Sequence, residues 1–289
     1  MPLPILDNWD TTAHSLHRAA HLLGTLRLLR LEHVPNFLEL ALKVRPEGLS
    51  SDTLPGGSEV ILDFRQAAMV VRSGSDDARI LALTGQSPAT LFEALLGALP
   101  TTELAALLSD TKTGSLVEQL FNVIQTRTYA APPNRDDLTD PQPFEVDRQT
   151  STAYAAVLDQ VFTGAARFRA RLSGMMTPIV VWPEHFDLSF LWFAAGKADE
   201  REPHMNFGFA PFSPGFEQPY LYAYAWPLPE GYGGPQLPPQ ARWHTEGWTG
   251  AVVAYDHIRS AGDAALFVED TCLAIYQGLL PLVRTLAAR

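Results

Sequence analysis

The sequence predicts an α+β protein in which helices cover antiparallel sheets. Apolar residues recur at helical spacing in a few long segments. Between these segments, apolar residues alternate with polar or small ones at the period of a strand, and turn residues separate successive strands. The 289 residues are 46% hydrophobic and 18% charged, a composition that can bury a substantial core.

The first half, residues 1–129, begins with an amphipathic helix that Asp10, Thr11 and Thr12 can cap and that extends to about Leu31. Alternation over 37–45 predicts a half-buried strand. An antiparallel meander and further helices should follow. The expected strands are 58–64, 67–72 and 79–83, and the expected helices are 88–99 and two pieces within 101–128.

Residues 130–143 are rich in proline and acidic side chains and are predicted to be a linker to the second half, 144–289. A helix capped near 150–152 should be followed by strands and a terminal helix that starts after Asp263 and is kinked or broken at Pro281. The expected strands are 178–183, 186–194, 219–226 and 249–255. Residues 197–218 are interpreted as a long aromatic-rich insertion.

The two halves share the order helix, about four strands, helix. Their opening helices also share a short signature, Gly24-Thr-Leu-Arg27 and Gly164-Ala-Ala-Arg167. We therefore expect an internal duplication of an α-β-β-β-β-α unit.

Composition excludes some partners. The net charge of -11 opposes binding to nucleic acid or to anionic membranes, both of which attract basic surfaces. The single cysteine, Cys272, permits no internal disulfide, and the N-terminus lacks the pattern of a secretory signal, so we expect a cytoplasmic protein. The sequence contains no P-loop, dinucleotide fingerprint, nucleophile elbow, HExxH or paired-cysteine metal motif, and we expect no cofactor.

The segment Tyr220–Trp226 is the strongest candidate for a site. In a strand, Tyr220, Tyr222, Tyr224 and Trp226 would form one aromatic face. This face is either core or the wall of a pocket for a small apolar or aromatic ligand, with polar groups converging from nearby segments. The predicted ligand-binding residues are Tyr222, Tyr224, Trp226, His204, Asp187 and Arg259.

Other interpretations stay open. A hydrolase or isomerase would use His204 with Asp187 or Asp256 as acid and base. A structural or protein-interaction role would make the aromatic residues packing groups only. In that case Asp256 is a helix cap, and Arg259 is its ion-pair partner or a surface group.

One helix face carries His14, His17 and His21, whose spacing could present imidazoles to a metal. A solvated polar face is the simpler interpretation.

Several short stretches resemble an uncharacterised bacterial family, domain of unknown function 5996. The matching stretches are Trp9-Asp10-Thr11, Leu16-His17, Gly24, Arg45 to Leu49, Phe186-Asp187-Leu188, Tyr222-Ala223-Tyr224, Pro227 with Pro229, Tyr255-Asp256 and Ile258-Arg259. The resemblance covers nearly the whole chain and implies no particular activity.

The chain departs from the family pattern at two places. His204-Met205 stands where relatives carry a His-Glu pair, which puts in doubt any acid/base or metal role that depends on that glutamate. The helical segment near 101–128 is longer than in relatives.

Overall fold

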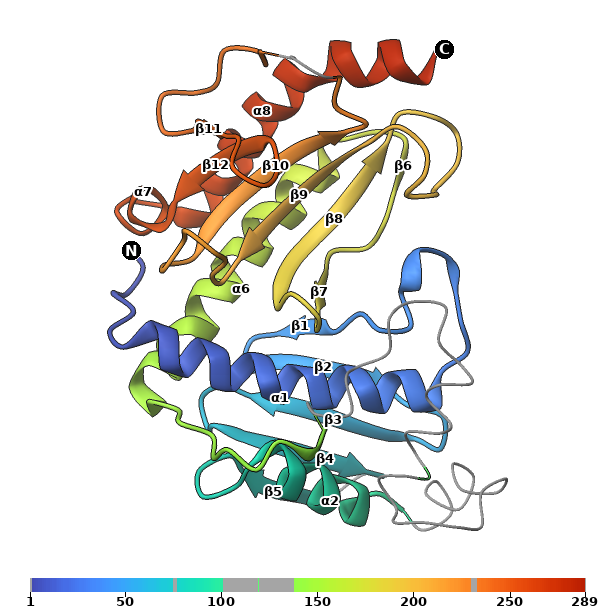
Figure 1. Cartoon of the computed structure of the whole chain (residues 1–289), viewed down its shortest axis with the longest axis vertical. Helices are drawn as coiled ribbons and strands as arrows, with labels where there is room; N and C mark the ends of the chain where they lie inside the picture. The colour runs from blue at the N-terminus through green and yellow to red at the C-terminus, as the bar shows by residue number, and fades with distance from the viewer. Residues whose placement is uncertain (1, 75–76, 101–118, 120–137, 230–232, 289) are drawn as a thin grey trace. The chain divides into compact units, whose positions relative to one another are not determined.

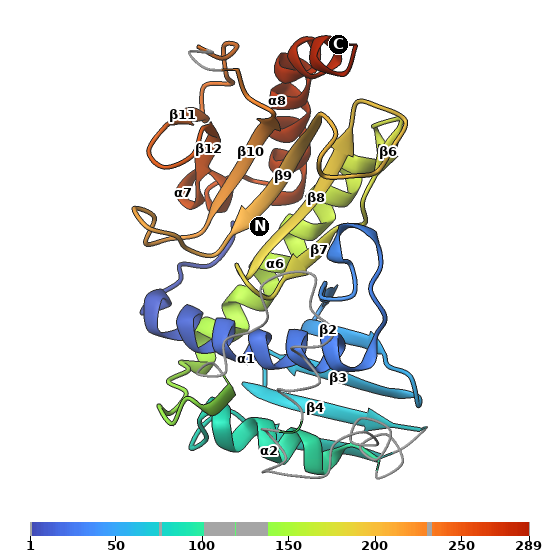
Figure 2. The same cartoon turned by 45° about the vertical axis from the view of Figure 1, so that its right-hand side comes forward.

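The computed structural model describes residues 2–74, 77–100, 119, 138–229 and 233–288 (Figures 1 and 2). It contains one five-stranded and one seven-stranded antiparallel sheet with helices, which confirms the α+β class. The chain divides into two compact units. The N-terminal unit comprises Leu6–Ala155 and Val181–Phe186, and the C-terminal unit comprises Met1–Ile5, Ala156–Val180 and Asp187–Arg289.

The N-terminal unit is built on a meander. Helices α1 (Trp9–Arg30) and α2 (Pro88–Ala98) lie side by side on one face of its sheet, where α1 contacts β2 and β3 and α2 contacts β4 and β5 (Figures 1 and 2). The strands, in spatial order, are β1 (Lys43–Arg45), β2 (Gly48–Thr53), β3 (Ser58–Asp63), β4 (Ala68–Ser73) and β5 (Asp77–Ala82). The predicted meander and the helix at 88–99 are confirmed, whereas the helices expected within 101–128 and most of the expected linker lie outside the described residues.

The prediction of a strand over 37–45 is wrong for most of that range. A 3-10 turn, η1 (Pro35–Phe37), comes first, and only Lys43–Arg45 forms a strand. The buried Arg27 of α1 accounts for the difference. Its Nε donates to the carbonyl of Glu39 at 3.0 Å and its Nη2 to the carbonyl of Leu38 at 3.2 Å, so these carbonyls are not available for a sheet.

The Arg27 guanidinium also donates through Nη1 to the carbonyl of Ser51, where the register between β2 and β3 shifts. One charged side chain thus satisfies backbone acceptors on two segments. Burial lowers the pKa of Arg27, and the negative charges of Asp52 and Glu39 act in the opposite direction.

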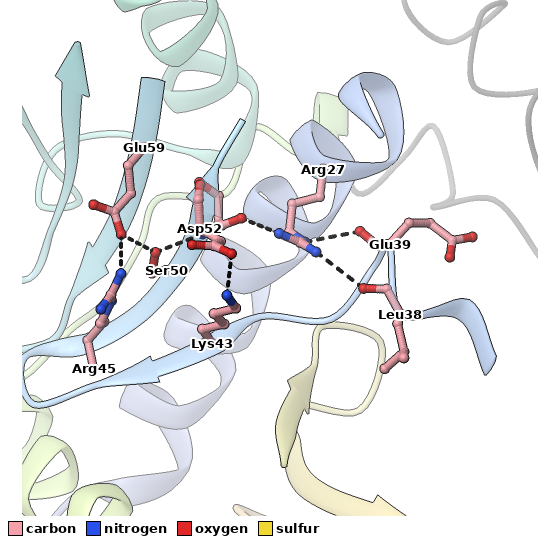
Figure 3. A network of polar contacts seen from close by, with 9 residues as sticks. Arg27, Leu38, Glu39, Lys43, Arg45, Ser50, Asp52 and Glu59 are labelled. Carbon is pink, nitrogen blue, oxygen red and sulfur yellow. Dashed lines mark hydrogen bonds and ion pairs between the residues drawn. The ribbon is translucent and has the colours of Figure 1, made fainter. Parts of the chain in front are cut away.

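Short polar links continue along the same edge of the sheet (Figure 3). Glu59 accepts hydrogen bonds from Arg45 at 2.9 Å and from Ser50 at 2.6 Å. Lys43 donates to Asp52, whose own backbone N–H donates to the Ser50 hydroxyl at 2.8 Å. Side-chain bonds thus join β1, β2 and β3 in addition to the backbone hydrogen bonds of the sheet.

The C-terminal unit holds the larger sheet, covered on one face by α6 (Arg148–Ala170) and α8 (Ala264–Ala287) (Figures 1 and 2). Its main strand order is β11-β12-β10-β9-β8-β6, with β7 paired to β8. The elements are β6 (Met175–Met176), β7 (Val180–Trp182), β8 (Asp187–Phe193), β9 (His204–Ala210), β10 (Tyr220–Trp226), β11 (Arg242–His244), β12 (Gly250–Ala254) and α7 (Tyr255–Arg259).

The interpretation of 197–218 as a long insertion is wrong at its centre, where β9 pairs with both β8 and β10. Met205, Phe207 and Phe209 alternate with smaller or polar residues, and Phe207 packs on Phe168 of α6 at 4.8 Å between ring centroids. The sheets of the two units differ in strand number, and the expected duplication is not confirmed.

Helix α8 continues through Pro281 instead of breaking there. It buries an apolar stripe that includes Val268, Ile275 and Leu279. Among the described helices, it alone has the length and hydropathy of a membrane span, properties that a core helix of a soluble protein also has.

The first prediction concerns Arg27. Replacing it by Met keeps the apolar stem but leaves buried carbonyls without a donor, so Arg27→Met should lower the free energy of unfolding by about 2–4 kcal/mol. Arg72→Met, at an exposed position on β4, is the matched control and should change it by less than about 0.5 kcal/mol. Urea titration measures both, and equal effects of the two substitutions would contradict the assigned role of Arg27.

Candidate functional site

The face of β8, β9 and β10 that points away from α6 and α8 carries Tyr220, Tyr222, Tyr224 and Trp226, which we call the aromatic ladder. We call this side of the sheet the tyrosine face. The pairing of the strands aligns the residues of this face in rows that cross the sheet. Each row contains one residue from β8, one from β9 and one from β10. The rows are Phe193, His204 and Trp226; Leu191, Asn206 and Tyr224; and Ser189, Gly208 and Tyr222. The predicted period-two alternation of Tyr220–Trp226 therefore holds, and it aligns these residues with polar groups that the neighbouring strands supply.

Tyr222 reaches across β9 to β8. A Cβ at Gly208 would overlap the Tyr222 ring and hydroxyl, so the ring occupies the space that the glycine leaves open. Beyond it, the Tyr222 hydroxyl donates to Oδ2 of the buried Asp187. Burial, together with the negative charge of Asp187, raises the pKa of Tyr222 well above its ordinary value. The predicted residues Tyr222 and Asp187 are thus in direct contact.

One end of the tyrosine face is core. Tyr220, Tyr222, Ala210 and Val252 form a buried cluster, against which Phe216, Tyr224 and Trp248 pack. Phe216 stacks on Tyr220 at 4.0 Å between centroids, and the Tyr220 hydroxyl lies 2.8 Å from the Ser213 hydroxyl. These contacts place the loop between β9 and β10 over the Tyr220 end.

The other end is more open. Trp226 is 42% exposed and stacks on His204 at 5.5 Å between ring centroids. His204 is buried, and its Nδ1–H donates to the carbonyl of Glu202 at 2.9 Å. Burial lowers the pKa of His204. The lowered pKa favours the neutral ring, and with Nδ1 protonated its Nε2 is a hydrogen-bond acceptor.

Asn206 and Tyr224 lie between these ends. The Asn206 Nδ2 donates to the Tyr224 hydroxyl at 2.9 Å, and the hydroxyl proton of Tyr224 is donated to none of the described residues. Asn206 is buried, with 8% of the residue exposed, yet its Oδ1 accepts no hydrogen bond within the described part of the chain. A buried acceptor without a donor carries an unfavourable desolvation cost.

The remaining predicted residues lie apart from this cluster. Arg259 donates to Asp256 at 2.6 Å within α7, as expected for a helix ion pair. Among the described residues, His204 forms a hydrogen bond with neither Asp187 nor Asp256, and its Nδ1–H binds the backbone carbonyl of Glu202. The structure therefore assembles Tyr222, Tyr224, Trp226, His204 and Asp187 on one sheet face, without the acid/base pairs proposed from sequence.

The histidines of α1 are not arranged as a metal centre. Within the described ranges, no group of three His, Cys, Asp or Glu side chains has suitable geometry. His14 bonds to the carbonyl of Asp10 at 2.8 Å, whereas His17 bonds to the carbonyl of Glu184 at 3.1 Å and stacks on Phe186. Burial of His17, with a smaller contribution from His21, lowers its pKa to about 4.

Sequence reasoning missed Asn206 and the role of Gly208. Both belong to β9, within the segment 197–218 that the sequence predicts to be an insertion. The signal was present, since His204 to Ala210 alternates between small or polar residues and Met or Phe.

The second prediction tests the packing of Tyr222. Gly208→Ala should displace the Tyr222 ring from Asp187 and lower the free energy of unfolding by about 1–3 kcal/mol. Gly196→Ala is the control, since a Cβ at Gly196 meets no atom within 4 Å. Chemical denaturation compares the two variants, and a neutral Gly208→Ala would show that Tyr222 does not depend on the glycine.

The third prediction concerns pH. With a folded pKa of about 4 and an ordinary value of 6.5, unfolded His17 binds a proton that the folded chain excludes. The contribution of neutral His17 is fully present above about pH 6.5 and is lost as pH falls toward 4, by at most about 3 kcal/mol. His17→Gln should flatten the fall in stability between pH 7.5 and 4.5, whereas His257→Gln, at an exposed position, should leave it unchanged. An unaltered pH profile in His17→Gln would rule out this titration.

The comparisons with known proteins agree with the resemblance seen in the sequence. The model of a family of unknown function, DUF5996, matches residues 2–278. No curated protein and no solved structure matches the chain significantly. With nearly all of its length matched, the chain belongs to this family of unknown function.

Proposed function

We propose that this protein binds a small molecule on the tyrosine face, at the end formed by Trp226, His204, Tyr224 and Asn206. The observation that carries the proposal is the unpartnered Oδ1 of the buried Asn206, beside a Tyr224 hydroxyl whose proton no described residue accepts. A ligand that donates to Asn206 Oδ1 would satisfy this acceptor, and the Tyr224 hydroxyl beside it can form a further hydrogen bond with the same ligand.

Aromatic surface supports the same location. Trp226 presents an exposed indole next to these polar groups, and an indole gives a ligand a large rigid apolar contact. The Tyr220 end serves to support the site, because its rings are already packed against Phe216 and Trp248. The proposed ligand contact is therefore limited to one end of the ladder.

Binding explains the polar groups better than catalysis does. An acid/base enzyme needs a titrating group held next to its partner. His204 instead has its Nδ1–H fixed on a backbone carbonyl, and Asp187 accepts from Tyr222. These contacts favour recognition through fixed donors and acceptors. The absence of basic clusters and the net charge of -11 are consistent with a cytoplasmic small-molecule binder.

The fourth prediction tests this function. In a ligand-observed NMR screen of small aromatic compounds of differing charge, those that bind the wild type should bind Trp226→Ala at least about tenfold more weakly. Tyr224→Phe, which removes only the hydroxyl, should weaken binding about threefold to tenfold while the protein stays folded.

The control variant is Leu266→Ala, which removes an exposed apolar side chain on α8. It should bind every compound as the wild type does. Compounds that bind all three variants with equal affinity would place the ligand elsewhere and contradict the proposed site.

A further inference from the structure

The chemistry of the tyrosine face also indicates what kind of ligand it fits, an inference that rests on the proposed function. Two of its polar atoms are acceptors. Nε2 of neutral His204 carries a lone pair, and Oδ1 of Asn206 accepts no hydrogen bond from the described residues. The ligand should therefore carry N–H or O–H donors.

The charges that act on this end are negative. Asp187 lies against the Tyr222 hydroxyl, and Glu200, in the loop that joins β8 to β9, acts electrostatically on both His204 and Tyr224. Neither His204 nor the tyrosines of the ladder show a comparable effect from a lysine or an arginine. A cation is thus favoured here and an anion is disfavoured.

Nearby basic side chains are engaged elsewhere. Arg201 forms an ion pair with Asp199 at 2.6 Å, and Lys197 acts on that same aspartate. Arg242 lies over the Phe216 ring at the core end of the ladder, 5.7 Å from its centroid. The Trp226 end therefore combines an exposed indole with acceptors and carboxylates, a combination that attracts organic cations through the ring face.

We propose that the ligand of the tyrosine face is a small organic ammonium ion, a primary or secondary amine attached to an apolar group. Its N–H groups would donate to Asn206 Oδ1 and His204 Nε2, and its charge would lie in the field of Glu200 and Asp187. The apolar group would rest on Trp226.

The opposite orientation of the Asn206 amide would favour a ligand of opposite charge. Rotation of the amide by half a turn would let Oδ1 accept from Tyr224 and would leave an N–H donor unpaired. That arrangement would suit a carboxylate ligand. Comparison of a cationic with an anionic probe therefore tests the polarity of the site directly.

The experiment compares phenethylammonium, phenethyl alcohol and phenylacetate by NMR titration of the full-length protein at pH 7.5. The ammonium ion should bind at least about tenfold more tightly than the alcohol, and phenylacetate should bind most weakly. Glu200→Gln should weaken ammonium binding about threefold. Glu217→Gln makes the same charge change in the loop between β9 and β10 and should leave it unchanged, since Glu217 is not among the charges acting on these rings. Trp226→Ala should weaken binding of the ammonium ion at least about tenfold.

Equal binding of the alcohol, tighter binding of phenylacetate, or no binding of any probe would each overturn the ammonium assignment. None of these results by itself removes the proposed function, which fails only when the broader screen finds no ligand that depends on Tyr224 and Trp226. The two failures are therefore distinguishable.

Discussion

Phenol hydroxyls on a buried sheet face must find hydrogen-bond partners, and this constraint organises the C-terminal unit. Strand β10 places Tyr220, Tyr222 and Tyr224 on the face opposite α6 and α8. Each hydroxyl meets a group from another segment: Ser213, Asp187 and Asn206 in turn. Gly208 makes the central contact feasible, because any larger residue would occupy the space of the Tyr222 ring.

The hydrogen-bond partners become less complete along the ladder toward Trp226, and this difference separates the packed end from the proposed site. At the Tyr220 end, the rings and hydroxyls are packed and bonded within the chain. At the Trp226 end, an indole is exposed, and the Asn206 amide oxygen lacks a donor among the described residues. A rigid core that holds a partly unsatisfied set of polar groups next to exposed aromatic surface is a suitable arrangement for ligand recognition.

In the N-terminal unit, the buried polar side chains have a different role. Arg27 donates to three backbone carbonyls, those of Leu38, Glu39 and Ser51, and these bonds hold the chain between α1 and β2 in place. Glu39 is likewise engaged, by His33 at 2.7 Å and by the backbone N–H of Val34 at 3.2 Å. Since these groups satisfy one another, the network is structural, and it explains why the apolar alternation at 37–45 does not produce a strand.

Local patterns were sufficient to determine the fold class, the meander at 58–82, the helices α1, α2, α6 and α8, and the two faces of Tyr220–Trp226. Each depends on periodicity or capping within a short stretch, as the Asp263 cap on the Leu266 N–H illustrates. Tertiary structure alone decided that Arg27 would interrupt the strand after α1, that β9 would join β8 to β10, and that Asp187 would meet Tyr222 and leave Arg259 to pair within α7. These outcomes depend on contacts between residues far apart in the chain, such as Tyr222 and Asp187, and a pattern within one segment carries no information about which distant group will satisfy a buried donor or acceptor.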